Sequence, residues 1–190
     1  MSVVIAIKTG DGVLVGADSQ TSFGEYEKEH KLAENNFKIT RMPHGILLGH
    51  AGEVRATQVL SCHKDWFEEL GDEPLTKKFL VTKISPRLSA ELRRRGLTDE
   101  DGDYDGQFLV AQGDRIFNLN CDFSVFTIPT FAAIGSGLDA ACFARAGARC
   151  GDERETVLAG LRLAAKNDTS VGAPFILIDT VRLAYEIVEG

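Results

Sequence analysis

The chain has 190 residues, of which 44% are hydrophobic and 26% are charged, a composition typical of a globular protein. We expect one domain, residues 1–190, because this length can bury a continuous core without disulfides or metals. The formal net charge of −7 argues against a nucleic acid or an anionic membrane as the main partner.

The four cysteines form no CxxC pair and have no metal-ligand spacing, so the sequence indicates neither a zinc site nor a disulfide framework. No apolar stretch approaches the ~20 residues that a membrane-spanning helix needs. The first residues lack the charged region and uninterrupted apolar run of a signal peptide. We therefore expect a cytoplasmic protein without a metal or a cofactor.

The first half of the chain begins with two β-branched runs, 3–7 and 13–17, around the turn sequence Thr9-Gly10-Asp11-Gly12, which predicts a hairpin. Residues 19–36 are polar and indicate a loop. A second hairpin is expected from 37–42 and 46–51. Apolar spacing then predicts one helix over 53–70 and another that carries Leu80, Ile84, Leu88 and Leu92, with a kink or break at Pro86.

The second half begins with an acidic loop over 99–105, which we expect to be solvated, with a cation site as the alternative. The later elements are expected to be strands at 108–112, 116–119, 125–127 and 132–134, helices at 138–149 and 153–167, and strands at 175–178 and 183–188. Helix pairs thus lie between antiparallel hairpins. This order predicts an α+β fold of two stacked sheets with a helix layer on each outer face.

One motif imitates a nucleotide site. The stretch from Gly135 to Ala140, GSGLDA, fits the G-x-G-x-x-A dinucleotide-binding fingerprint between a strand and a helix. That fingerprint requires a βαβ unit, with an acidic residue at the end of the next strand. Here the helix is followed by a second helix, so we do not expect a nicotinamide or flavin enzyme.

Ser2 has the chemistry of a possible nucleophile. A hydroxyl needs a neighbouring base, and a free α-amine on the same residue, with a pKa of about 7.7–8.0, is such a base. Removal of Met1 would expose this amine. Serine is also a common second residue for reasons unrelated to catalysis, and the first two residues alone favour that explanation.

Four segments, in order and over nearly the whole chain, resemble the proteasome β-subunit and HslV-type family of N-terminal nucleophile (Ntn) peptidases. They are SVVIAI…GVLVGAD from Ser2 to Asp18, NFKI…LLGHAG from Asn36 to Gly52, FLVA…IGSG from Phe108 to Gly137, and DTSVG from Asp168 to Gly172. The resemblance, to a bacterial proteasome-related member, implies a four-layer αββα sandwich of Ntn-hydrolase type. It also implies a threonine-type endopeptidase with Ser2 as the nucleophile.

The resemblance assigns each matching residue a role. Ser2 would attack the peptide carbonyl, and Lys38, held by Asp18, would lower the pKa of its hydroxyl. The Gly52 N–H would bind the oxyanion. The remaining expected roles are the tuning of the terminal amine by Ser136 and Asp168, and the lining of the substrate pocket by Thr21, Thr40, His50 and Val54.

The chain also departs from the family pattern. Serine replaces the more usual threonine, and it lacks the methyl group that restricts the hydroxyl's rotamer. The loop before Lys38 is longer than usual, so Lys31 and Lys28 are alternatives for the catalytic lysine. Val171 stands where the family usually has a second serine, with Ser170 immediately before it.

The resemblance further implies partners. We expect peptides or unfolded proteins as substrates, a homo-oligomeric ring or double ring that encloses the active sites, and an ATP-dependent unfoldase. Two other functions stay open at this point. One is a catalytically silent ring subunit, and the other is an Ntn amidase or peptide ligase that acts on a small substrate.

Overall fold

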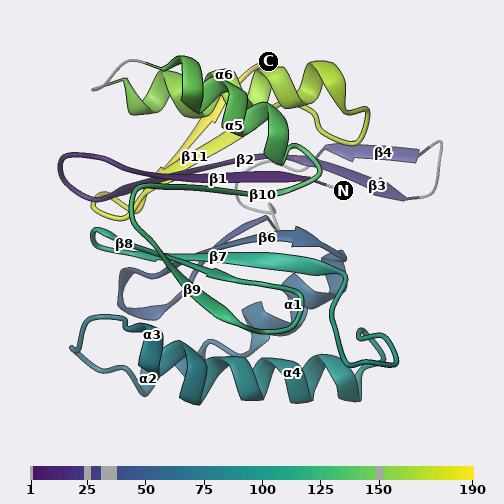
Figure 1. The fold of residues 1–190 in the computed structure, drawn as a ribbon, viewed down its shortest axis with the longest axis vertical. Coiled ribbons are helices and arrows are strands. Elements are labelled where there is room, and N and C mark those ends of the chain that lie inside the picture. The colour runs from purple at the N-terminus through teal and green to yellow at the C-terminus, as the bar shows by residue number, and fades with distance from the viewer. Residues whose placement is uncertain (1, 24–26, 31–37, 149–151) are drawn as a thin grey trace.

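The structure, a computed structural model, describes residues 2–23, 27–30, 38–148 and 152–190. Two antiparallel five-stranded sheets are stacked face to face, and helices cover both outer faces (Figure 1). The predicted α+β sandwich of two sheets between helix layers is therefore confirmed.

The first sheet has the strand order β10–β1–β2–β11–β12. Every side chain from Val3 to Ile7 in its interior strand β1 is buried, because helices cover one face of the sheet and the second sheet covers the other. This burial on both faces explains why the first strand is apolar at consecutive positions instead of alternating. The strands are β1 (Val3–Lys8), β2 (Val13–Asp18), β10 (Phe131–Gly135), β11 (Phe175–Asp179) and β12 (Tyr185–Val188).

The second sheet is a meander in which each strand pairs with its neighbours in sequence, in the order β5–β6–β7–β8–β9. Its inner face packs on the first sheet through small and branched side chains, among them Leu47 and Leu109 against Val4 and Ala6. The strands are β5 (Ile39–Arg41), β6 (Leu47–Gly52), β7 (Gly106–Gln112), β8 (Arg115–Leu119) and β9 (Val125–Ile128).

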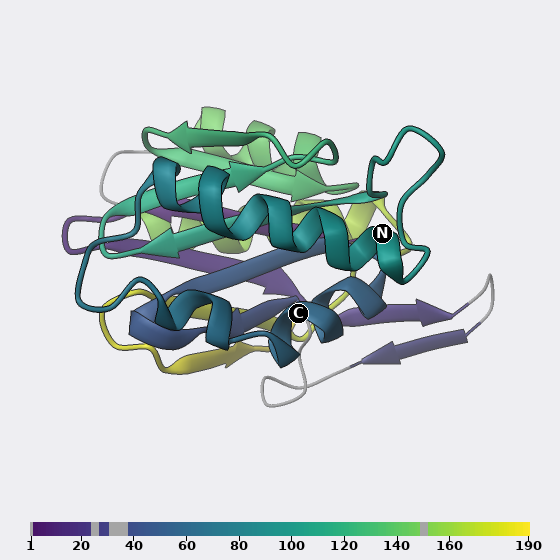
Figure 2. The same ribbon diagram turned by 90° about the horizontal axis from the view of Figure 1, so that it is seen from below.

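The two helix layers come from different parts of the chain. Helices α5 (Leu138–Gly147) and α6 (Glu153–Asn167) pack on the first sheet. The segment between β6 and β7 supplies the other layer, in which α4 is the longest helix and lies over the second sheet (Figure 2). This layer contains α1 (Val54–Cys62), α2 (Asp65–Glu68), α3 (Lys77–Phe79) and α4 (Ser85–Arg94).

Two helix predictions need correction. The helix expected over 53–70 is divided into α1 and α2, because the backbone of His63 (φ −111°, ψ 42°) leaves the helical region. The break expected at Pro86 takes the form of a π-helical turn, Leu80–Ile84, directly before α4. Pro86 itself lies in the first turn of α4, where the N–H that proline lacks is not needed.

The loop predicted over 19–36 is wrong where the structure describes it. Strands β3 (Gln20–Phe23) and β4 (Glu27–His30) pair antiparallel as a separate two-stranded sheet. These polar residues lack the apolar alternation that predicts a strand. Residues 24–26 and 31–37, including Lys31, lie outside the described residues.

Candidate active site

Ser2 lies immediately before β1, against the turn that follows β10, and is only 4% exposed. Its carbonyl oxygen accepts hydrogen bonds from the Gly137 N–H (3.3 Å) and from the Ser136 hydroxyl (3.4 Å). Gly135 has φ +91°, and a Cβ at this position would lie 2.2 Å from the Ser2 carbonyl oxygen. Only glycine permits this approach. The turn that resembles a nucleotide fingerprint therefore fixes the backbone of Ser2.

A buried ion pair adjoins the first strand. Lys38 Nζ lies 2.6 Å from Asp18 Oδ2, and the two side chains are 10% and 0% exposed. The other carboxylate oxygen of Asp18 accepts a hydrogen bond from the Val3 N–H at 3.0 Å. Two more backbone N–H groups, both at 3.2 Å, donate to Oδ2. Asp18 is thus held from several sides, and one of its bonds goes to the peptide group that joins Ser2 to Val3.

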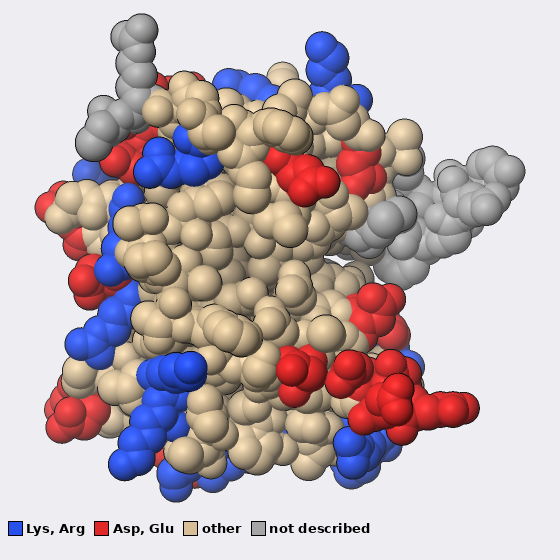
Figure 3. Space-filling view, viewed as in Figure 1, with Lys and Arg blue, Asp and Glu red and all other residues tan. Residues whose placement is uncertain are grey.

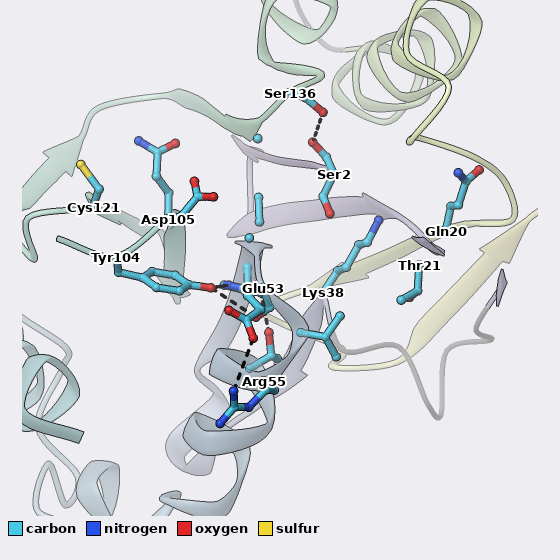
Figure 4. A pocket seen from close by; sticks show the side chains of 18 residues that line it. Ser2, Gln20, Thr21, Lys38, Glu53, Arg55, Tyr104, Asp105, Cys121 and Ser136 are labelled. Atoms are coloured by element: carbon cyan, nitrogen blue, oxygen red, sulfur yellow. Dashed lines mark hydrogen bonds and ion pairs between the residues drawn. The ribbon is translucent and has the colours of Figure 1, made fainter. Parts of the chain in front are cut away.

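The ion pair also determines the electrostatics beside Ser2. Burial lowers the pKa of Lys38, while the charge of Asp18 and the hydrogen bond to it oppose that shift. In Figure 4 the Lys38 side chain extends toward Ser2. Of the alternative lysines, Lys28 lies on β4, which pairs with β3, and Lys31 lies outside the described residues. The structure therefore brings Lys38 to Asp18, as the resemblance predicted.

Gly52 ends β6 with φ +148° and is separated from α1 by one residue, Glu53. A Cβ on this residue would lie 2.7 Å from both the Asp105 carbonyl oxygen and the Tyr104 hydroxyl oxygen. The backbone conformation and the space thus both require glycine. In the second sheet, Gly52 at the end of β6 pairs with Gly106 at the start of β7, so two glycines face each other there.

A pocket of about 820 Å³ opens between the two sheets at this end of the molecule. Figure 3 shows a hollow at the right edge, with acidic side chains gathered below it in the region of the segment between α4 and β7. Of the residues predicted for the site, those that line the pocket are Ser2, Thr21, Lys38, His50, Gly52, Val54 and Ser136.

Thr40, also predicted as a substrate-binding residue, does not line this pocket. Thr40 pairs with Leu48 on β6, four positions before Gly52, and so lies farther along the sheet. Asp18 and Asp168 are not lining residues either, and Asp18 is completely buried behind Lys38.

Asp168 follows α6 and is hydrogen-bonded by neighbouring serines. Burial would raise its pKa, but hydrogen bonds from Ser136 and Ser170 outweigh this effect and lower the pKa. The Ser170 hydroxyl donates to Asp168 Oδ1 at 2.6 Å. Val171, which stands at the position of the family's usual second serine, is buried in the core beneath the helices. Within this segment the hydroxyl that bonds Asp168 therefore comes from Ser170, one position before Val171.

Thr57 and Tyr104 are among the pocket residues that sequence reasoning missed. Tyr104 belongs to the acidic loop expected to be solvated, yet it is 2% exposed and lies among core residues. A lone tyrosine between acidic residues was the available signal, since an aromatic ring in a polar loop often buries its body and hydrogen-bonds through its hydroxyl.

The part of the chain that the structure describes lacks two further features. Within it, no group of three or more His, Cys, Asp or Glu side chains could hold a metal ion. Likewise, none of its helices is both long enough and apolar enough to cross a membrane.

Several solved structures share this fold. Thiobacillus denitrificans BPH matches with a TM-score of 0.75 and 23% sequence identity, over 97% of this chain and 99% of that chain. The structure of BPH in complex with epoxomicin matches with a TM-score of 0.74 and 22% identity, over 96% and 99% of the two chains. Anbu from Hyphomicrobium sp. strain MC1 gives 0.70 and 17%, over 99% of this chain and 88% of its own.

The chain has the proteasome-like Ntn fold. No protein-family model matches the sequence, and no curated protein matches it. The likeness is therefore one of architecture.

Proposed function

We propose that this chain is an N-terminal nucleophile peptidase of the proteasome-related family, with Ser2 as the nucleophile once Met1 has been removed. The observation that carries the proposal is the buried Lys38–Asp18 ion pair. Asp18 also accepts a hydrogen bond from the Val3 N–H, which belongs to the peptide group that follows Ser2. A buried charge pair costs desolvation energy and is weak evidence for stability. Lys38 and Ser2 line the same pocket, where a cation can lower the pKa of a serine hydroxyl.

In the acylation step, Ser2 Oγ attacks the carbonyl carbon of the scissile peptide bond. The α-amine of Ser2 takes the hydroxyl proton, and the Lys38 ammonium lowers the free energy of the developing alkoxide. The new C–O bond places negative charge on the carbonyl oxygen, which the Gly52 N–H stabilises. The amine then gives its proton to the leaving nitrogen as the C–N bond breaks, which leaves an ester on Ser2.

Hydrolysis of the ester uses the same groups, with a water molecule as the nucleophile. The amine takes a proton from a water molecule, whose oxygen attacks the ester carbon. The C–O bond to Ser2 then breaks, Ser2 Oγ regains a proton and the acid product leaves. Asp168, with Ser136 and Ser170 bonded to it, supports this cycle as an anion that tunes the basicity of the amine.

We further propose that the substrates are peptides or unfolded proteins, and that the chains assemble into a homo-oligomeric ring or double ring served by an ATP-dependent unfoldase. The fold shared with BPH and Anbu supports this assembly as a proposal. The pocket of about 820 Å³ supports the substrate class, because it has room for side chains of an extended peptide.

The decisive test uses the intact mass of the protein and the rate of peptide hydrolysis. The wild-type protein should lack the mass of Met1 and should gain one adduct with epoxomicin, the molecule bound in one BPH structure. The Ser2→Ala variant should also lose Met1, because alanine is equally small, but it should gain no adduct and hydrolyse no peptide. The Ser2→Thr variant should keep both properties.

Each contrary result has a distinct meaning. Retained Met1 without hydrolysis would favour a catalytically silent subunit. An adduct at Ser2 without peptide hydrolysis would favour an amidase or ligase that acts on a small substrate. Unchanged hydrolysis by Ser2→Ala would refute the proposal.

A further inference from the structure

The turn that contains Gly52 is enclosed by three side chains to which neither the sequence nor the proposed mechanism gives a catalytic role. His50 lies two residues before Gly52 on β6, and Thr57 lies in the first half of α1. Tyr104 comes from the segment before β7 and reaches the same turn from the opposite side of the pocket (Figure 4).

His50 joins the other two side chains. Its Nδ1 lies 2.5 Å from the Thr57 hydroxyl, and its Nε2 lies 2.7 Å from the Tyr104 hydroxyl. The ring is 3% exposed, and its centroid lies 4.8 Å from that of Phe108. Burial, together with the positive charge of Lys38, lowers the pKa of His50 to about 3. The imidazole is therefore neutral at every working pH and has no nitrogen available to act as a general base.

The hydrogen-bond chain has a direction. The Tyr104 hydroxyl donates to the Glu53 carbonyl oxygen at 3.2 Å, so its oxygen is left to accept from His50 Nε2–H. His50 Nδ1 then accepts from the Thr57 hydroxyl. This arrangement satisfies all three contacts with a neutral imidazole. This hydrogen-bond chain runs from Thr57 on α1 through His50 on β6 to Tyr104, and it ends on the carbonyl of Glu53, the residue that follows Gly52.

Tyr104 also contacts Gly52 itself. Its hydroxyl oxygen lies 2.7 Å from the place where a Cβ on Gly52 would be, so it packs directly against that backbone. The Glu53 carbonyl, which Tyr104 bonds, also accepts the Ala56 N–H at 3.0 Å in the first turn of α1. The peptide groups on the C-terminal side of Gly52 are therefore fixed both by the helix and by the tyrosine.

We propose that Tyr104, His50 and Thr57 are positioning residues that hold the Gly52 N–H where the oxyanion forms. The proposal rests on the proposed function, because Gly52 has an oxyanion to bind only if Ser2 attacks a carbonyl. Preorganised donors stabilise a transition state because they need no reorientation as the charge develops. A turn that ends in glycine lacks side-chain restraint of its own, and the hydrogen-bond chain supplies it from outside.

The test compares variants that each remove one hydroxyl group. Tyr104→Phe and Thr57→Val should each lower kcat for a fluorogenic peptide about 10–100-fold and change KM by less than about twofold. Thr57→Ser keeps the hydroxyl and should retain wild-type kcat. Because Tyr104 and Thr57 act through one imidazole, the double variant should be little slower than the slower single variant.

Two matched controls separate positioning from general loss of stability. Tyr185→Phe removes a phenol hydroxyl that donates to the Ile39 carbonyl at 3.2 Å, the same distance as the bond from Tyr104 to the Glu53 carbonyl. Thr156→Val removes a buried hydroxyl from the first turn of α6. Both controls should keep kcat within about twofold of wild type, even where their melting temperatures fall as far as those of the Tyr104 and Thr57 variants.

A peptide aldehyde provides the readout that a purely structural role would not change. Its adduct with a serine hydroxyl carries an oxygen in the oxyanion position, so its Ki should rise by the same factor as kcat/KM falls. Wild-type kcat in folded Tyr104→Phe and Thr57→Val overturns the inference and leaves the proposed function intact. A raised KM at unchanged kcat overturns it in favour of simple substrate contact. Hydrolysis by Ser2→Ala removes the proposed function, and this inference with it.

Discussion

Replacing Lys38 by methionine tests the buried ion pair that carries the proposed function. The substitution keeps most of the length of the side chain but removes the ammonium group 2.6 Å from Asp18 Oδ2. Removing one partner of a buried pair costs about 3–5 kcal/mol, because it leaves an uncompensated charge. Asp18 retains three backbone N–H donors, so we expect the lower end of this range, about 3 kcal/mol.

Urea unfolding, followed by the fluorescence of the single tryptophan, Trp66, measures that loss. The matched control is Lys8→Met, which removes a surface ion pair to Asp114 at 3.6 Å and should change stability by less than about 1 kcal/mol. Peptide hydrolysis by Lys38→Met should fall about 10²–10³-fold, as for the loss of one preorganised charge-stabilising group. If Lys38→Met is as stable as Lys8→Met and still hydrolyses peptide, another lysine serves the site and the reasoning is wrong.

Three further predictions concern the surroundings of the pair. Gly52→Ala would place a Cβ 2.7 Å from the Asp105 carbonyl oxygen, so thermal melting should show a loss of about 1–3 kcal/mol and hydrolysis should nearly cease; a stable, active variant would contradict the fit of the turn. As the pH falls from 6.5 toward about 3, the unfolded chain takes up a proton that His50 in the folded chain does not, so the wild-type free energy of unfolding should decrease. That decrease should be steeper than in His50→Gln by up to about 1.4 kcal/mol per pH unit, and equal slopes would show that His50 titrates normally. Ser170→Ala removes a donor that lowers the pKa of Asp168, so the acid limb of the pH–rate profile should move to higher pH; an unmoved limb would separate Asp168 from catalysis.

Most of the two large sheets could be predicted because their strands carry the information locally. The run from Val3 to Ile7 is apolar at every position since it is buried on both faces, and the turns β1–β2, β5–β6 and β7–β8 contain glycine. The β3–β4 ribbon is composed of polar residues, so its sequence contained no apolar alternation to detect. The division of the helix lies in the backbone angles of a single residue, His63, which apolar periodicity does not report.

The candidate site, too, could be predicted from the sequence only in part. The resemblance predicted Asp18, Lys38 and Gly52 as site residues, and the structure brings the first two into contact. Tyr104 and Thr57 meet at His50 only through the tertiary fold, from segments that are 47 residues apart in the chain. Such a hydrogen-bond chain has no signature in a single sequence, because its members need only be near one another in space.

The most direct test of the central claim is the intact mass of the purified protein before and after treatment with epoxomicin, with Ser2→Ala measured alongside. We expect a wild-type chain without Met1 that gains a single adduct, and a Ser2→Ala chain without Met1 that gains none. A wild-type chain that hydrolyses peptide while retaining Met1, or an adduct that persists in Ser2→Ala, would contradict the assignment of Ser2 as the nucleophile.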